Sequence, residues 1–148
     1  MSETIKVPTL IEISTDDLQG KIIAVYFSAH WCGPCRQFTP LLIATYQKLK
    51  EEGKPFEVVF ISNDKDQAGF KSYFSKMPWK AVDFADEERR DAIGDKLHLK
   101  GLPTLIVLNS EGKVLSKNGQ PDVTKLKEKA FDVWSTTEPK EKGDCIVS

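Results

Sequence analysis

The sequence lacks the features that mark several other classes of protein. Three cysteines and two histidines in 148 residues are too few for a disulfide-stabilised scaffold. The 21 basic and 22 acidic residues are interspersed, so the chain has no concentrated basic segment of the kind that binds nucleic acid. No apolar run approaches the ~18–20 residues of a membrane helix. The longest, IIAVYF at residues 22–27, suits a buried strand instead.

The amino terminus, MSETIKVPTL, has no cationic flank followed by a long apolar run. We therefore expect no secretory signal and a reducing, cytoplasmic compartment, where paired thiols are more often catalytic or metal-binding than structural. The length suits one domain with a real core. Beyond Trp134 the sequence turns polar, with Pro139 and Gly143. We expect a folded domain over residues 1–134 and a flexible tail over residues 135–148.

Hydrophobic patterning predicts an α/β fold. Valine-rich and aromatic runs predict strands, and apolar residues at helical spacing predict helices. The predicted strands cover residues 22–28 and 56–62 and the two arms of a hairpin in TLIVLNSEGKVLS, and the predicted helices cover residues 34–52, 67–76, 87–97 and about 123–134. MPWKAVDFAD, before the third helix, is expected to be irregular. Alternating strands and helices imply a partly parallel sheet with helices on both faces, and the hairpin adds an antiparallel edge.

Two of the cysteines form the motif Cys32-Gly33-Pro34-Cys35, which falls where a predicted strand ends and a helix begins. This spacing brings the two sulfurs close enough to bridge. Cys32 would face the free N–H groups at the helix N-terminus, which favour a thiolate. Cys35 would lie one turn inward, placed to attack a mixed disulfide on Cys32. The motif therefore predicts that Cys32 attacks and Cys35 resolves, with no bound cofactor.

Two other interpretations of this cysteine pair compete with the redox one. A structural zinc ion needs four ligands, and the other candidates, His30, His98 and Cys145, form no second pair. We therefore expect no metal site. Buried thiols that serve only packing are common enough, but two that flank Gly-Pro at a strand-to-helix turn are hard to explain in that way.

WCGPC followed about seventy residues later by GLPT resembles the thioredoxin-fold oxidoreductases. YFSAHWCGPCRQFTP and LHLKGLPTLIVL are similar to the tryparedoxin and nucleoredoxin branch, and the resemblance covers nearly all of residues 9–134. It implies a thioredoxin-like mixed central sheet and a cis peptide bond between Leu102 and Pro103 beside the disulfide. It also implies that the backbone at Leu102 pairs with an incoming substrate chain, on a surface lined by Trp31 and the region of Trp79.

Three positions depart from the pattern of this branch and of thioredoxin. Tryparedoxins carry Pro-Pro between the cysteines, whereas this chain has Gly33-Pro34. Thioredoxins place a buried aspartate where this chain has Tyr26, so the proton of Cys35 would go to water or to the leaving thiolate. Asp83 stands where the family usually has proline. These departures leave the electron donor open between a flavoenzyme reductase and a low-molecular-weight thiol.

Several side chains near the motif have two interpretations. Trp31 beside a reactive thiolate favours a role in client docking over one in the core. His30 either tunes the thiolate or simply ends a strand at the surface, and we favour the second because a histidine acts on a thiolate mainly at contact distance. Arg36 either lies near the active surface or is an ordinary solvated residue. Trp79 either lines the site or packs in the core.

The third cysteine begins the last four residues, Cys145-Ile146-Val147-Ser148. A cysteine, two aliphatic residues and a terminal serine match the prenylation pattern, with serine favouring farnesyl. The alternative is coincidence, since short patterns occur by chance. One prenyl chain anchors weakly, and the mixed charges of the tail form no polybasic patch, so we expect reversible membrane association.

Together these features predict a monomeric enzyme, a protein-disulfide reductase of the tryparedoxin or nucleoredoxin type. Its partners would be disulfide-containing client proteins and an external reductant, and nucleic acid is not expected among them. An alternative is a binding module for signalling partners whose affinity the disulfide switches. A thioredoxin-fold peroxidase is disfavoured because the supporting threonine and arginine motif is not present.

Overall fold

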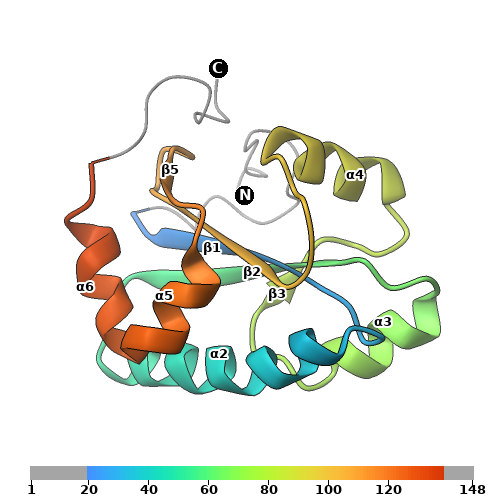
Figure 1. Ribbon diagram of the computed structural model, residues 1–148, viewed down its shortest axis with the longest axis horizontal. Coiled ribbons are helices and arrows are strands. Elements are labelled where there is room, and N and C mark those ends of the chain that lie inside the picture. The colour runs from blue at the N-terminus through green and yellow to red at the C-terminus, as the bar shows by residue number, and fades with distance from the viewer. Residues whose placement is uncertain (1–19, 139–148) are drawn as a thin grey trace, which may run out of the picture.

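Residues 20–138 are described by a computed structural model and form a mixed sheet with helices on both faces (Figure 1). The strands are β1 (Ile22–Ser28), β2 (Phe56–Ser62), β3 (Lys80–Ala81), β4 (Thr104–Leu108) and β5 (Val114–Ser116). The helices are α2 (Gly33–Glu51), α3 (Gln67–Phe74), α4 (Glu87–Lys96), α5 (Gly119–Leu126), the short 3₁₀ helix η1 (Lys127–Lys129) and α6 (Ala130–Ser135). Cys145 and the rest of residues 139–148 lie outside the described residues.

The strands follow the order β3-β2-β1-β4-β5, which places β1 at the centre. β1 runs parallel to β2, and β2 runs parallel to β3. β4 pairs with β1 and β5 in antiparallel fashion, and the turn between β4 and β5 passes through Gly112 at a φ of 86°, a conformation that glycine adopts without strain. The predicted mixed sheet with an antiparallel hairpin at one edge is confirmed.

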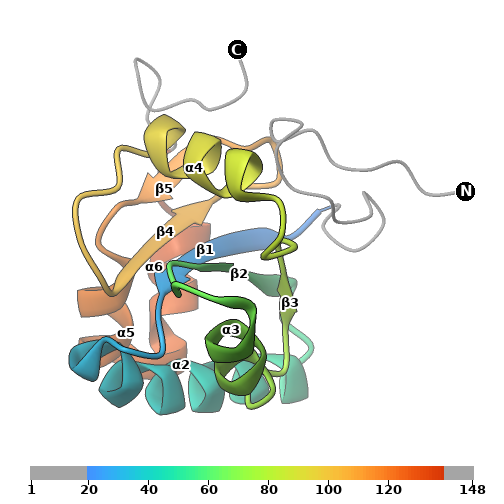
Figure 2. The ribbon, with the colours of Figure 1, turned by 90° about the vertical axis from the view of Figure 1, so that its right-hand side faces the viewer.

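The central strand buries both of its faces. Ala24 and Tyr26 point into the larger core, beneath α2, α3, α5 and α6. Val25 and Phe27, on the opposite face, pack in a second core with Ile93 of α4. Figures 1 and 2 show this arrangement, with α4 alone on its side of the sheet and α2 and α3 together on the other. Burial on both faces explains why β1 is an uninterrupted apolar run.

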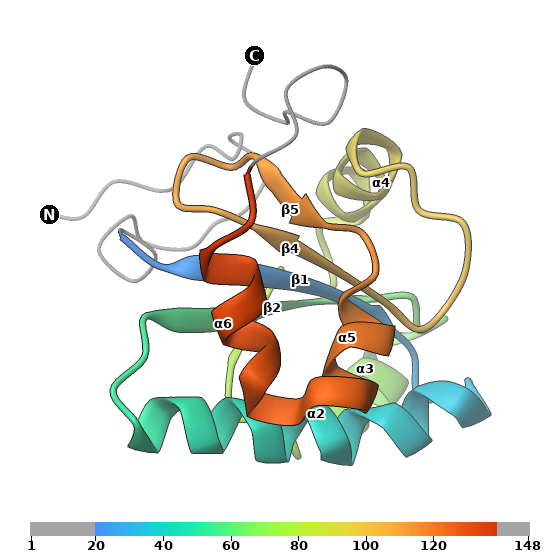
Figure 3. The same cartoon turned by 60° about the vertical axis from the view of Figure 1, so that its left-hand side comes forward.

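Two segments differ from the sequence prediction. The last helix, expected to be continuous, is divided into α5, η1 and α6 (Figure 3). The break falls at Lys127, whose φ of 54° is incompatible with a right-handed helix. MPWKAVDFAD is not wholly irregular, because Lys80 and Ala81 pair with Val59 and Phe60 of β2 as the short edge strand β3. Within residues 20–138, no helix is long and apolar enough to cross a bilayer.

Candidate active site

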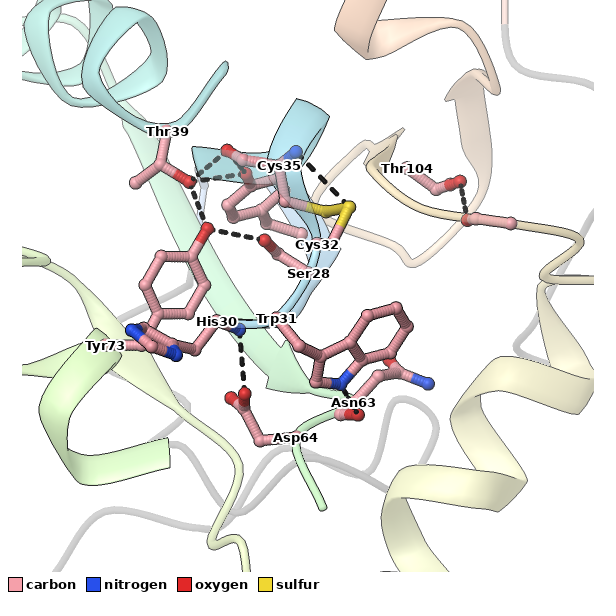
Figure 4. Close-up of a disulfide and its surroundings, with 12 residues drawn as sticks. Ser28, His30, Trp31, Cys32, Cys35, Thr39, Asn63, Asp64, Tyr73 and Thr104 are labelled. Atoms are coloured by element: carbon pink, nitrogen blue, oxygen red, sulfur yellow. Dashed lines mark hydrogen bonds between the residues drawn. A yellow bond between two sulfur atoms is a disulfide. The ribbon is translucent and has the colours of Figure 1, made fainter. Parts of the chain in front are cut away.

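The cysteine pair lies where β1 passes into α2, and its two residues form a disulfide (Figure 4). Cys32 is the N-cap of α2, and its Sγ accepts a hydrogen bond from the Cys35 N–H at 3.3 Å. The Cα atoms of the two cysteines are 5.2 Å apart, inside the usual range for a disulfide. The helix start that the spacing predicted is therefore in place, with a sulfur facing free backbone donors.

The two sulfur-bearing residues are not equivalent. Cys35 is fully buried at 0 % exposure, whereas Cys32 keeps 8 % of its surface exposed. Ala29 packs with both cysteines, and Leu102 covers the same cluster from the neighbouring loop. An incoming disulfide can therefore reach Cys32 far more readily than Cys35.

The turn that carries the cysteines is tied to the segment that follows β2. The Asp64 carboxylate accepts a hydrogen bond from the His30 backbone N–H at 2.7 Å, and the Asn63 N–H donates to the Ser28 carbonyl at 2.9 Å. Asp64 is itself buried, and the hydroxyl of Ser62 donates to its other carboxylate oxygen at 2.7 Å. These bonds between the ends of two parallel strands hold the loop before Cys32 in one place.

Trp31 presents its indole ring at the surface directly before Cys32. Its side chain is 54 % exposed, although its ring N–H donates to the Asn63 carbonyl at 3.1 Å. The Lys65 ammonium lies 5.8 Å from the centre of the indole ring. A large aromatic surface is thus held at a fixed angle beside the more accessible sulfur, which is the arrangement expected of a docking platform.

The loop before β4 reaches the cysteine pair from the other side. The peptide bond between Leu102 and Pro103 is cis, and Leu102 packs against the cysteine cluster. Pro103 lines a hollow of about 350 Å³ together with Pro34 of α2. The structure therefore brings the motif and the proline loop together, as the resemblance implied.

A chain of buried hydroxyl groups lies behind the disulfide. The Tyr26 hydroxyl is 2.7 Å from Thr39 Oγ1 and donates a long bond of 3.4 Å to the Cys35 carbonyl. Thr39 Oγ1 is 2.6 Å from the Tyr73 hydroxyl, which is 2.7 Å from Ser28 Oγ. The chain joins β1, α2 and α3 through side chains that sequence analysis did not single out, apart from Tyr26.

This chain of hydroxyls supplies no ready proton acceptor. Burial raises the pKa of Tyr26 well above its ordinary value, and the neighbouring Tyr73 raises it further. Tyr26 therefore stays a neutral phenol at physiological pH. The structure places this phenol where thioredoxin, by the resemblance, has a carboxylate that can take up a proton.

The other candidate residues lie in two different places. Trp79 is only 4 % exposed and packs edge-on against Tyr26 and Tyr46, so of the two interpretations that the sequence left open it takes the position in the core and not the one beside Trp31. His30 packs against the ring of Tyr73, and both it and Arg36 line a groove between α2 and α3. In the part of the chain that the structure describes, no three side chains of histidine, cysteine, aspartate or glutamate gather as a metal site would require.

Comparison with known proteins agrees with this geometry. A family model described as thioredoxin-like matches residues 20–114, which contain the cysteine motif, the proline loop and the central strands. The chain belongs to the thioredoxin-like family. The resemblance to the nucleoredoxin and tryparedoxin branch is confirmed by relatives of both kinds.

Mouse (Mus musculus) nucleoredoxin is 45 % identical over 111 residues, which are 75 % of this chain and 26 % of the relative. The solved structure of Trypanosoma brucei tryparedoxin is 35 % identical with a TM-score of 0.77, covering 87 % of each chain. That of tryparedoxin II complexed with glutathionylspermidine is 38 % identical with a TM-score of 0.75, covering 80 % of this chain and 82 % of that one. The chain thus spans about a quarter of the length of the nucleoredoxin and most of the length of the tryparedoxins.

Proposed function

We propose that the protein is a thiol–disulfide oxidoreductase that reduces disulfide bonds in client proteins. The observation that carries the proposal is the asymmetry of the cysteine pair. Cys32 caps α2 and keeps 8 % of its surface exposed, and Cys35 is fully buried one turn inward and already bonded to it. This is the arrangement that a two-step exchange requires.

In the first step, the Cys32 thiolate attacks one sulfur of a client disulfide. A bond forms between Cys32 Sγ and that sulfur, and the other client sulfur leaves as a thiolate. In the second step, Cys35 loses its proton and attacks Cys32 Sγ, which expels the second client sulfur. The client gains two electrons and two protons, and the protein is left with the Cys32–Cys35 disulfide.

The proton of Cys35 goes to the departing client thiolate or to water. The phenol of Tyr26, whose hydroxyl lies 3.4 Å from the Cys35 carbonyl oxygen, stays protonated because burial raises its pKa, so it cannot accept this proton. A leaving thiolate is generated within bonding distance of Cys32 at the same moment. Direct transfer therefore needs no carboxylate at the position of Tyr26.

An external reductant restores the dithiol. A low-molecular-weight dithiol or thiol fits the resemblance to a tryparedoxin solved with glutathionylspermidine, and a flavoenzyme reductase is the other class of donor. Oxidation of two donor thiols balances the reduction of the Cys32–Cys35 disulfide, so the cycle requires no bound cofactor. We propose that it runs in the cytoplasm, in a monomeric protein.

We further propose that Cys145 carries a prenyl group, which gives weak and reversible membrane association. Labelling cells with a prenyl analogue tests this. Incorporation into the wild-type protein and none into a Cys145→Ser variant is expected. Equal labelling of the two proteins would refute prenylation of Cys145 and leave the proposed redox chemistry unaffected.

Reduction of insulin with dithiothreitol as the donor tests the main proposal. The wild-type protein should accelerate precipitation of the insulin chains, and Cys32→Ser should run at the rate of dithiothreitol alone because it lacks the attacking sulfur. A Cys145→Ser variant is the matched control and should match the wild type. A wild-type rate no faster than that of Cys32→Ser would refute the proposal.

A further inference from the structure

A groove of about 410 Å³ opens between α2 and α3, next to the cysteine loop. His30, Arg36 and Lys76 contribute groups that can carry positive charge, and Pro40, Ile43 and Ala44 contribute apolar surface. Among the described residues that line the groove, none is acidic. The groove therefore combines an apolar floor with cationic groups around it.

The cations of this groove are not used within the fold. Neither Arg36 nor Lys76 forms an ion pair with any residue in the range 20–138, whereas Lys21, Lys50 and Arg89 each pair with a carboxylate. Asp64, the nearest buried acid to His30, is occupied by the His30 backbone N–H and the Ser62 hydroxyl. Two exposed cations beside an apolar hollow leave an electrostatic site with no counterion among residues 20–138.

The groove lies within reach of a polypeptide that is reacting at Cys32. Arg36 directly follows Cys35, and His30 precedes Cys32 by two residues, so its Cα lies within about 7.6 Å of the Cys32 Cα. Figure 4 shows the His30 side chain directed toward Tyr73, on the side of the loop away from Trp31. Because an extended chain covers about 3.3 Å per residue, a client segment about three residues from its reacting cysteine reaches the end of the groove that His30 and Arg36 line.

We propose that this groove binds an acidic segment of the client protein, with an apolar residue beside the acidic one, close to the disulfide being reduced. The inference rests on the proposed function and names a substrate preference for it. Charge complementarity selects this occupant, because glutamate and aspartate are the protein side chains whose negative charge would neutralise Arg36 and Lys76, neither of which forms an ion pair within residues 20–138. Trp31 and this groove then contact the client on opposite sides of the reacting sulfur.

Two peptides that differ at one position test the preference. Each peptide contains one internal disulfide. Three residues from its first cysteine it carries either glutamate or lysine, with a leucine beside that residue. The ratio of kcat/KM values for the two is measured with dithiothreitol as donor. The wild type should prefer the glutamate peptide by about fivefold, the size expected for one or two partly screened ion pairs, and 0.5 M salt should reduce the ratio toward one.

Variants at Lys76 locate the preference in the groove. Lys76→Gln should lower the ratio, and Lys76→Glu should invert it so that the lysine peptide reacts faster. Lys71→Gln is the matched control, because Lys71 is an exposed lysine of α3, five residues before Lys76, that does not line the groove, and its ratio should equal that of the wild type. The inversion is a readout that mere loss of stability does not produce.

Three results would overturn the inference. One is equal kcat/KM for the two peptides with the wild-type protein, and another is a preference that Lys76→Glu leaves unchanged. The third is that glutathione sulfonate, an anion that cannot undergo thiol–disulfide exchange, changes the NMR chemical shifts of the groove residues while the glutamate peptide does not. That result would show that the groove binds a small thiol compound and not a client segment. The neutral 2-hydroxyethyl disulfide separates this question from the proposed function, since its reduction by the wild type reports the chemistry at Cys32 alone.

Discussion

The surface of the candidate site and the layer beneath it are built in contrasting ways. At the surface, Trp31 and Cys32 offer accessible atoms, and the indole ring is fixed mainly by one hydrogen bond to the Asn63 carbonyl. Beneath them, the buried hydroxyls of Tyr26, Thr39 and Tyr73 join three elements through short hydrogen bonds. With the proposed function, this difference predicts that client recognition and stability rest on separate residues, although these lie a few positions apart in the chain.

The largest expected effect on stability comes from emptying the buried layer. Tyr26→Ala removes a fully buried ring that packs against Phe38, Phe60 and Trp79. It also removes one of the hydrogen-bond partners of the Thr39 hydroxyl. The free energy of unfolding should fall by about 3–5 kcal/mol, as measured by urea denaturation. A loss below about 1 kcal/mol would show that the layer is not the stabilising part of the site.

Alkaline pH should act on the same layer with a smaller effect. Because folding raises the pKa of Tyr26, the folded protein holds the phenolic proton more tightly than the unfolded chain, whose tyrosines titrate near pH ~10. This contribution to stability is complete below about pH 10 and is lost as the pH rises toward the pKa of the folded state. It corresponds to a fall of up to about 1.4 kcal/mol per pH unit for each such tyrosine.

Tyr26→Phe isolates this contribution. The variant should show a shallower decline of the free energy of unfolding above pH 10 than the wild type. Tyr46, whose pKa is also raised by burial and by its bond to Glu57, remains in both proteins and supplies the residual slope. Identical slopes for the two proteins would mean that the Tyr26 phenol titrates equally in the folded and unfolded states.

The smallest expected effect on stability is at the surface. Trp31→Ala should change the free energy of unfolding by less than about 0.5 kcal/mol, since the side chain is mostly solvent-exposed. Its kcat/KM for insulin should nevertheless fall by about tenfold, the equivalent of one lost docking contact of moderate strength. Unchanged kcat/KM for insulin would show that Trp31 does not contribute to client docking. A large loss in the free energy of unfolding would show that the surface residues also stabilise the fold.

The sequence predicted the elements more completely than the contacts between them. The apolar run of β1, the motif at its end and the hairpin of β4 and β5 are local patterns, so each was placed close to its true bounds. The break at Lys127 was missed because a helical spacing of apolar residues continues across it. β3 was missed because two residues of edge strand leave almost no pattern.

The candidate site divides in the same way. The placement of Cys32 and Cys35 at a helix start could be predicted because it follows from the spacing of the motif and the preceding strand, whereas their roles stay a prediction. Tyr26 was noticed only as a departure from thioredoxin, since its partners Thr39 and Tyr73 come from two different helices and no local pattern links them. Trp79 could not be assigned without the structure, because a tryptophan in an irregular segment packs inward or outward with equal ease.

The central claim, that Cys32 attacks and Cys35 resolves, is tested most directly by trapping. Reduced Cys35→Ser is incubated with a disulfide-containing client, and the products are analysed by mass spectrometry without reductant. Because the first step proceeds and the second cannot, we predict a one-to-one mixed disulfide through Cys32 that dithiothreitol releases, and no such adduct with the Cys32→Ser, Cys35→Ser double variant. An adduct through Cys145, or none at all while the wild type still reduces the client, would contradict the assignment.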